Sequence, residues 1–329
     1  ARYVLLATLF VLLGLVLFIR GADLDGRPAL LYRSASLLAM VLAFLSKESA
    51  YTFPVLLVLL LAWRGDWKNR RSWFTLLPFF GIAAAFLVWR WILFGGVGGY
   101  INKAGQPEVL SLGIVPSVKA LLFRLWAVLF FPINWSNDPG LLLGVATILY
   151  LAALMWLWRT QVPRRSLLVA LGFLLAIALP PLSQLLIGVD LQKSRVLYLP
   201  SVGFCLLLAT AVERHKAKWI VSIAVLVFNL AALLHNLAAW EYASRKAQAA
   251  CNVAVRCAQR HDGRMAVLGL PHSLQGVYFF ANGFPECVEM QSGVEKAKVE
   301  VRDTASPVDA AQYSCVLDWD KNKEELSVR

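Results

Sequence analysis

Lys47 and Glu48 stand in the segment FLSKESAYTFP, between the apolar runs 34–46 and 50–63. A charged side chain at bilayer depth costs about 2.5–3.5 kcal/mol on insertion scales, so such a residue marks either a turn at the membrane interface or a functional site. The Lys47 ammonium group can bind an anionic head group. The Glu48 carboxylate can bind a divalent cation or act as a base.

Three further side chains could take part in the same chemistry. Arg195 precedes the apolar run 197–212, and a guanidinium group binds phosphate through two parallel hydrogen bonds. Asp138 and Asp190 lie between apolar runs. Together with Glu48 they offer carboxylates that can bind a divalent cation such as Mg²⁺ or Mn²⁺, or act as a base. The alternative is that Lys47 and Glu48 only end a helix and that Arg195 extends its charge to the interface. No metal site is assigned.

The elements that must position these residues are membrane helices. The chain has 329 residues, of which 59% are hydrophobic and only 16% charged, and its mean hydropathy is +0.63. A soluble domain of this size carries a larger charged fraction. Most of the apolar runs approach the ~20 residues that cross a bilayer. We therefore predict an all-α polytopic membrane protein with eight transmembrane helices, at 3–19, 34–46, 50–63, 73–94, 140–158, 166–188, 197–212 and 219–239.

Loop charges set the predicted orientation. The positive-inside rule assigns Lys/Arg-rich loops to the cytoplasm. Four loops qualify, and two spans separate the first from the second and the third from the fourth: 20–33, 64–71, 159–165 and 213–218. Lys47, Glu48, Asp190 and Arg195 then lie on the outer side. Of the net charge of +12, the basic excess belongs to residues 1–240, with 21 Lys/Arg against 8 Asp/Glu, so no nucleic-acid partner is predicted.

The segment 113–132, GIVPSVKALLFRLWAVLFFP, must not span if every basic loop is to be cytoplasmic. Its unbroken helical part, 117–131, would be about 22 Å long at 1.5 Å per residue, and it contains Lys119 and Arg124. We predict an interfacial helix on the outer side.

Residues 1–240 are thus predicted to form the membrane domain and residues 241–329 a small extracytoplasmic α/β domain. EYASRKAQAACNVAVRCAQRH continues the last span as a helix, RMAVLGLP and YSCVLDW are strands, and SLQGVYFFANGF is a turn-and-helix or a loop. An even number of cysteines suits two disulfides in an oxidising compartment, although buried thiols are the alternative. The spacing does not favour zinc. The cysteines concerned are Cys251, Cys257, Cys287 and Cys315.

Five segments occur in an order that resembles a known family: ARYVLLATLF, FLSKESAYTFP, GGVGGY, FFPINWSNDPG and SRVLYLPSVGF. They resemble the GT-C fold membrane glycosyltransferases, specifically the bacterial relatives of the tetratricopeptide-containing protein O-mannosyltransferases. The resemblance covers roughly residues 1–212, and its most specific motif is Arg-x-Leu-Tyr-Leu-Pro-Ser. No tetratricopeptide period is visible in the chain.

The resemblance implies a transferase that takes a sugar from a polyprenyl-phosphate donor at the outer face of the bacterial inner membrane, with a periplasmic tail. Lys47, Arg195 and Arg2 match residues that contact the donor phosphate. Glu48 would orient Lys47 or assist a metal, and Tyr198 would shape the donor pocket.

The family's catalytic Asp lies in a first outer loop that precedes this chain. The catalytic base is therefore expected upstream, and the chain is expected to be the C-terminal part of the membrane domain. A second hypothesis is a non-catalytic scaffold subunit that keeps a GT-C-derived fold and binds other membrane-complex subunits through its tail. A transporter would have inverted repeats and broken helices at mid-membrane, and the sequence has neither.

Overall fold

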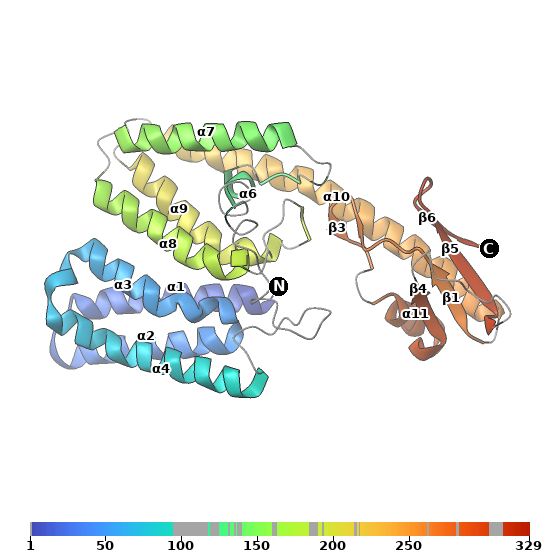
Figure 1. Cartoon of the computed structure of the whole chain (residues 1–329), viewed down its shortest axis with the longest axis horizontal. Coiled ribbons are helices and arrows are strands. Elements are labelled where there is room, and N and C mark those ends of the chain that lie inside the picture. Colours follow the sequence, from blue (N-terminus) through green and yellow to red (C-terminus); the bar gives the residue numbers. More distant parts are fainter. Residues whose placement is uncertain are drawn as a thin grey trace. The chain divides into compact units, whose positions relative to one another are not determined.

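The computed structural model describes residues 2–94, 118, 125–130, 132–134, 136, 140–159, 163–183, 190–192, 194–213, 216, 218–261, 263–280, 283–302 and 312–329. The chain divides into two compact units (Figure 1). The helical unit comprises residues 1–132, 140–189 and 193–228. The tail unit comprises residues 229–329 together with two short segments from earlier in the chain, 133–139 and 190–192.

Each predicted apolar run overlaps one helix, and the protein is mostly helical. Among the described helices, α1, α2, α4 and α10 are long and apolar enough to cross a membrane. Helix α10 has 43 residues and continues without a break into the tail unit, as predicted. The helices are α1 (Arg2–Ala22), α2 (Gly26–Ser46), α3 (Phe53–Arg64), α4 (Arg70–Phe94), α6 (Leu125–Phe130), α7 (Gly140–Arg159), α8 (Arg164–Ser183), α9 (Tyr198–Val212) and α10 (Lys218–Arg260), with short 3₁₀ turns η1 (Glu48–Thr52), η2 (Asp66–Lys68) and η5 (Ser194–Leu197).

The predicted interfacial helix at 113–132 lies mostly outside the described residues. Within it, α6 is helical, and its Leu125 and Leu129 are buried against α8 and α9. The remainder of that prediction, including Lys119 and Arg124, is not tested.

Small residues let α1 and α2 approach closely. A Cβ added at Gly14 would lie 3.4 Å from the Ala39 Cβ of α2 and only 2.8 Å from the Phe53 ring of α3. The buried Ser36 hydroxyl donates a 2.7 Å hydrogen bond to the Gly14 carbonyl oxygen. Between membrane helices, such van der Waals packing and interhelical hydrogen bonds replace the hydrophobic driving force. The turn that contains Lys47 directly follows α2, the second helix of this pair.

Helices α8 and α9 meet in the same way at Gly203. A Cβ at this position would lie 2.7 Å from the Cα and 3.0 Å from the backbone nitrogen of Leu174, which is fully buried. Because the obstacle is backbone rather than a movable side chain, no rotamer change can make room. Gly203 therefore fixes the distance between these two helices.

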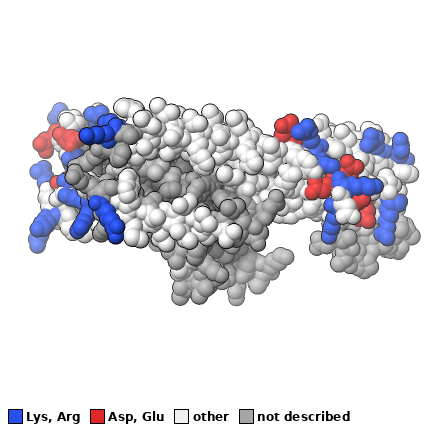
Figure 2. Space-filling view, turned by 90° about the horizontal axis from the view of Figure 1, so that it is seen from above, with Lys and Arg blue, Asp and Glu red and all other residues white. Residues whose placement is uncertain are grey.

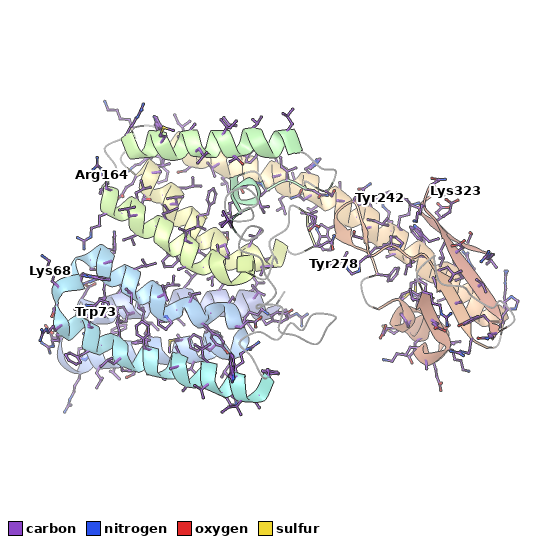
Figure 3. All side chains as sticks on the ribbon, viewed as in Figure 1. Lys68, Trp73, Arg164, Tyr242, Tyr278 and Lys323 are labelled. Carbon is purple, nitrogen blue, oxygen red and sulfur yellow. A yellow bond between two sulfur atoms is a disulfide. The ribbon has the colours of Figure 1, made fainter. Side chains whose placement is uncertain are left out.

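Lys and Arg gather at one end of the helical unit (Figure 2), the end where Figure 3 labels Lys68 and Arg164. The Arg64 guanidinium lies 2.7 Å from a carboxylate oxygen of Asp23 and 3.2 Å from one of Asp66, so the α1–α2 and α3–α4 turns meet there. Arg165, at the start of α8, donates from Nε (2.7 Å) and from Nη2 to the carbonyl oxygen of Ala62 in the last turn of α3. A cation at a helix C-terminus satisfies its free carbonyls.

In the tail unit, α10 and α11 (Phe284–Ser292) accompany a four-stranded sheet of order β4-β1-β5-β6. Strand β1 (Met265–Leu268) is parallel to β4 (Val299–Arg302) and β5 (Cys315–Asp320), and β6 (Glu325–Val328) is antiparallel to β5. The two predicted strands are confirmed as β1 and β5. An alanine-rich face of α10 shares the core with the sheet, including Ala250, Ala254, Val267 and Leu317.

The sequence predicts a turn-and-helix or a loop for 273–284, of which 281 and 282 lie outside the described residues, whereas the structure has a hairpin at 273–278. Strands β2 (Ser273–Leu274) and β3 (Val277–Tyr278) pair antiparallel around a two-residue turn. The turn residues Gln275 and Gly276 both have positive φ, 46° and 73°. This is the conformation of the hairpin turn that matches strand twist.

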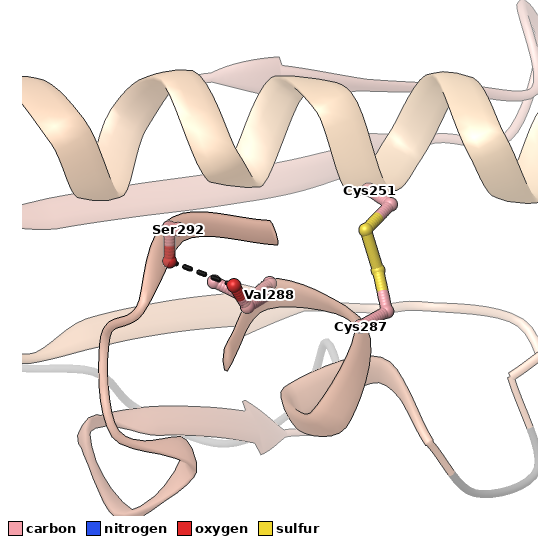
Figure 4. Close-up of a disulfide and its surroundings, with 4 residues drawn as sticks. All are labelled: Cys251, Cys287, Val288 and Ser292. Atoms are coloured by element: carbon pink, nitrogen blue, oxygen red, sulfur yellow. Dashed lines mark hydrogen bonds between the residues drawn. A yellow bond between two sulfur atoms is a disulfide. The ribbon is translucent and has the colours of Figure 1, made fainter. Parts of the chain in front are cut away.

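Two disulfides connect α10 to the rest of the tail unit. Cys251 pairs with Cys287 of α11 (Figure 4), and Cys257 pairs with Cys315 of β5, at Cα–Cα distances of 6.3 and 6.4 Å. These are the two disulfides that the even cysteine count predicts. Disulfides persist in oxidising compartments, so they indicate an extracytoplasmic tail.

Glu300 on β4 is surrounded by donors. Its carboxylate accepts hydrogen bonds from the Tyr313 hydroxyl (2.6 Å) and from Arg302 Nε (2.8 Å), and Arg264 lies 3.5 Å away. The Tyr313 hydrogen bond and then the Arg302 contact hold the pKa of Glu300 below its ordinary value.

We expect Gly203→Val to destabilise the helical unit by about 1–3 kcal/mol, the usual cost of overpacking. The measurement is the apparent Tm of the purified protein in detergent. Gly81→Val is the matched control, because Gly81 is also helical but has nothing within 4 Å of an added Cβ. An equal loss in both variants would contradict the close-approach interpretation.

We expect acid to destabilise the tail unit partly through Glu300. A lowered folded-state pKa means that the stabilisation is present above the unfolded-state pKa and disappears as the pH falls through the folded-state value. Glu300→Gln should therefore lower Tm at neutral pH and flatten its fall in acid, measured by thermal unfolding between neutral and strongly acidic pH. Glu295→Gln, an exposed carboxylate of the same unit, should keep the wild-type profile.

Candidate functional site

Lys47 and Glu48 break the helical hairpin formed by α2 and α3. Helix α2 ends at Ser46, and Lys47 is extended, with φ −162° and ψ 139°. The 3₁₀ turn η1 follows, and α3 begins at Phe53 with Pro54 in its first turn, where proline's missing N–H costs nothing. The turn contacts α1, α2, α3 and α8. The sequence therefore places a charged pair at a packed helix junction rather than in an open loop.

The two side chains form an ion pair, Lys47 Nζ to Glu48 Oε1, and only 18% and 26% of their surfaces are exposed. The Lys47 ammonium also lies 5.6 Å from the centre of the Tyr3 ring, in the first turn of α1. A cation over an aromatic face is stabilised without neutralisation. Lys47 is thus held by one carboxylate and one ring, and a stronger anion such as phosphate could replace Glu48 as its partner.

The other predicted phosphate ligands lie near the same end of the helical unit. Arg2 is the exposed first residue of α1, next to Tyr3. Arg195 belongs to η5, which leads directly into α9, and its side chain lies outside what the structure describes. Tyr198 is the first residue of α9 and is 43% exposed. Leu199 beside it and Ala50 of η1 belong to one buried cluster.

That end is opposite the Lys/Arg-rich end. Arg64 and Arg165 join the α1–α2 turn, the end of α3 and the start of α8 at the basic end. The start of α1, the end of α2, the start of α3 and the start of α9 are the other termini of these packed helices. Lys47 and Glu48 are therefore separated from the main basic surface by the length of the apolar helices.

Asp138 lies outside the described residues. Asp190 belongs to the tail unit. Asp190 accepts hydrogen bonds from the backbone and the side-chain nitrogen of Gln192, at 3.1 and 3.0 Å. Within the described part of the chain, no group of three His, Cys, Asp or Glu side chains could hold a metal ion.

Two short segments, one between α6 and α7 and one between α8 and α9, contact the β2–β3 hairpin. The sequence analysis did not predict this contact. Asn134 donates a 2.6 Å hydrogen bond to the Gln275 carbonyl oxygen, and the Leu191 backbone N–H donates a 3.0 Å bond to the Gly276 carbonyl oxygen. The Asn134 backbone N–H donates to Asn236 Oδ1 of α10 at 2.9 Å. Leu191 is buried in the tail core.

The absence of a side chain at Gly276 makes room for the first of these segments. A Cβ there would lie 2.6 Å from Asn134 Oδ1 and 2.7 Å from Ser136 Cβ. Residues 133–136 and 190–192 are thus held by a hairpin far away in sequence. Leu191 thus folds with the tail unit, whereas Arg195, four residues later, belongs to the helical unit.

Comparison with known protein families, with curated proteins and with solved structures found no match to this chain.

We expect Gly276→Ala to release residues 133–136 and 190–192 from the hairpin, because its Cβ would overlap Asn134 and Ser136. Faster amide hydrogen exchange at Asn134 and Leu191 is the direct measurement. Gly293→Ala is a closely matched control. Its φ of 74° repeats the backbone strain of Gly276, yet nothing lies within 4 Å of its Cβ. Equal exchange in both variants would show that only backbone strain was involved.

Proposed function

We propose that this chain is part of a GT-C type glycosyltransferase of the bacterial inner membrane. It would move a sugar from a polyprenyl-phosphate donor to an acceptor at the extracytoplasmic face. The observation that carries the proposal is the half-buried Lys47–Glu48 pair at the end of the helical unit opposite its basic loops. The SRVLYLPSVGF motif reaches the same end through η5 and α9.

The proposed orientation has eight spans, with the Lys/Arg-rich end in the cytoplasm. Two features support it. The disulfides of the tail unit require an oxidising compartment. Helix α10 begins after the basic loop 213–218 and is about 65 Å long at 1.5 Å per residue, more than twice the hydrocarbon thickness. A helix that starts on the cytoplasmic side can therefore deliver the tail to the other side.

In the proposed reaction, an acceptor oxygen attacks the anomeric carbon of the sugar while the bond to the lipid phosphate breaks. The phosphate leaves with the bonding electrons, and the acceptor proton passes to a base. Lys47, Arg195 and Arg2 would bind the leaving phosphate and stabilise its charge. Glu48 would orient Lys47 in the empty site, and Tyr198 would line the donor pocket.

We expect Lys47→Gln and Arg195→Gln each to weaken binding of a long-chain polyprenyl phosphate at least about tenfold, since one charge-assisted contact contributes about 1.5–3 kcal/mol. Native mass spectrometry of the purified chain, titrated with the lipid, measures the affinity. Lys47→Arg keeps the charge and should retain most of the binding. Lys68→Gln, at the opposite end, should bind like wild type.

Transfer is tested with the polypeptide purified from its source membranes and a panel of radiolabelled polyprenyl-phosphate sugars. Incorporation of label that Arg195→Gln abolishes would support the transferase. Lipid binding with no transfer to any acceptor in the membrane extract would favour the scaffold subunit. Unchanged lipid affinity in both Lys47→Gln and Arg195→Gln would contradict the phosphate site itself.

A further inference from the structure

A polar cavity of about 460 Å³ opens at the Lys/Arg-rich end of the helical unit. It lies where α1 ends, α2 begins, α3 ends and α4 begins. Three arginines line it: Arg33 of α2, Arg64 of α3 and Arg71 of α4. These residues are far apart in sequence, and the α1–α2 and α3–α4 turns bring them together. The cavity has no part in the proposed transfer reaction, which takes place at the other end.

The three arginines differ in how their charges are balanced. Arg64 is held between Asp23 and Asp66, so its charge is compensated within the protein. Arg33 and Arg71 have no ion pair among the described residues. Asp25, the other carboxylate in the lining, is exposed at the start of α2 and pairs with neither. Arg33 and Arg71 therefore line the cavity without an ion-pair partner among the described residues.

The neutral groups of the cavity also favour an anion. Asn69, Ser72 and Thr75 line it from the start of α4. The Asn69 side chain accepts a 3.0 Å hydrogen bond from the Arg71 backbone N–H and so caps this helix. The first turn of an α-helix carries a partial positive charge. The partial charge at the start of α4 therefore has the same sign as the charges of Arg33 and Arg71.

The surroundings of the cavity fit a lipid rather than a free ion. Phe18, Leu30 and Leu61 contribute apolar lining, and Leu30 is 66% exposed. At the same end, Trp67 and Trp73 pack edge to face at 5.0 Å, and the Trp73 indole donates to the Trp67 carbonyl oxygen. Tryptophans of this kind lie at the level of lipid head groups. A phosphodiester in the cavity would therefore have its acyl chains beside an apolar surface.

We propose that this cavity binds the phosphate of an anionic phospholipid of the surrounding leaflet, with Arg33 and Arg71 as its ligands. A guanidinium group offers a phosphate two parallel hydrogen bonds, and a pair of them can hold both non-bridging oxygens. Basic pockets between membrane helices bind anionic head groups in this way. The bound lipid would connect the α1–α2 turn to the α3–α4 turn, beside the Arg64–Asp23 ion pair.

The test uses the full chain, stripped of lipid in detergent and titrated with phosphatidylglycerol while native mass spectrometry counts bound lipid. The double variant Arg33→Gln/Arg71→Gln should lose affinity at least about tenfold. Arg27→Gln/Lys68→Gln is the matched control. It removes the same charge from the same two loops, but neither residue lines the cavity. Arg33→Lys/Arg71→Lys, which keeps the charge, shows whether lost binding reflects misfolding.

Three outcomes would overturn the proposal. Equal weakening in the pocket and control variants would mean that loop charge alone attracts the lipid. Equal binding of phosphatidylcholine would show that the site does not require an anionic head group. Displacement of phosphatidylglycerol by millimolar inorganic phosphate would show that the ligand is a free anion. Selective loss in the glutamine variant, with binding retained in the lysine variant, supports the site.

Discussion

Close backbone contact at small residues is the constraint on which the helical unit depends. In a bilayer, apolar side chains gain nothing by leaving lipid for protein, so helices are held by packing and by interhelical hydrogen bonds. Gly14 and Ser36 provide both between α1 and α2, and Gly203 brings α9 onto the backbone of α8. Helix α8 contacts both α9 and the η1 turn that follows Lys47, so one packed helix connects the two parts of the candidate site.

The bilayer also determines where charged side chains can lie. An ion at membrane depth is costly, so the described charges of the helical unit lie at helix ends and are partly compensated there. Lys47 has Glu48 and the Tyr3 ring, and Arg64 has two aspartates. Arg33 and Arg71 have no such partner in the described chain. The two ends of the helical unit therefore differ. At one end an anion must displace Glu48 to reach Lys47, whereas at the other Arg33 and Arg71 can bind an anion without breaking an ion pair.

The sequence is informative wherever the signal is local. Apolar runs predicted the helices, two short apolar segments predicted the strands β1 and β5, and an even cysteine count predicted two disulfides. The hairpin at 273–278 was missed because each strand has only two residues and its turn is Gln-Gly rather than the usual Asn-Gly. Asn134 and Gln275 are 141 residues apart, and Arg33 and Arg71 meet only through the packing of two turns. Periodicity carries no information about such non-local polar contacts.

The tail unit shows why those non-local contacts matter for the candidate site. Its two disulfides join α10 to α11 and to strand β5, and such bonds persist in an oxidising compartment. The hairpin in that unit holds Asn134 and Leu191, and residue 191 leads within four residues to Arg195. Residues 190–192, which lie between α8 and α9 in the sequence, therefore fold with the tail unit, although both of these helices belong to the other unit. No local pattern in so short a segment predicts that.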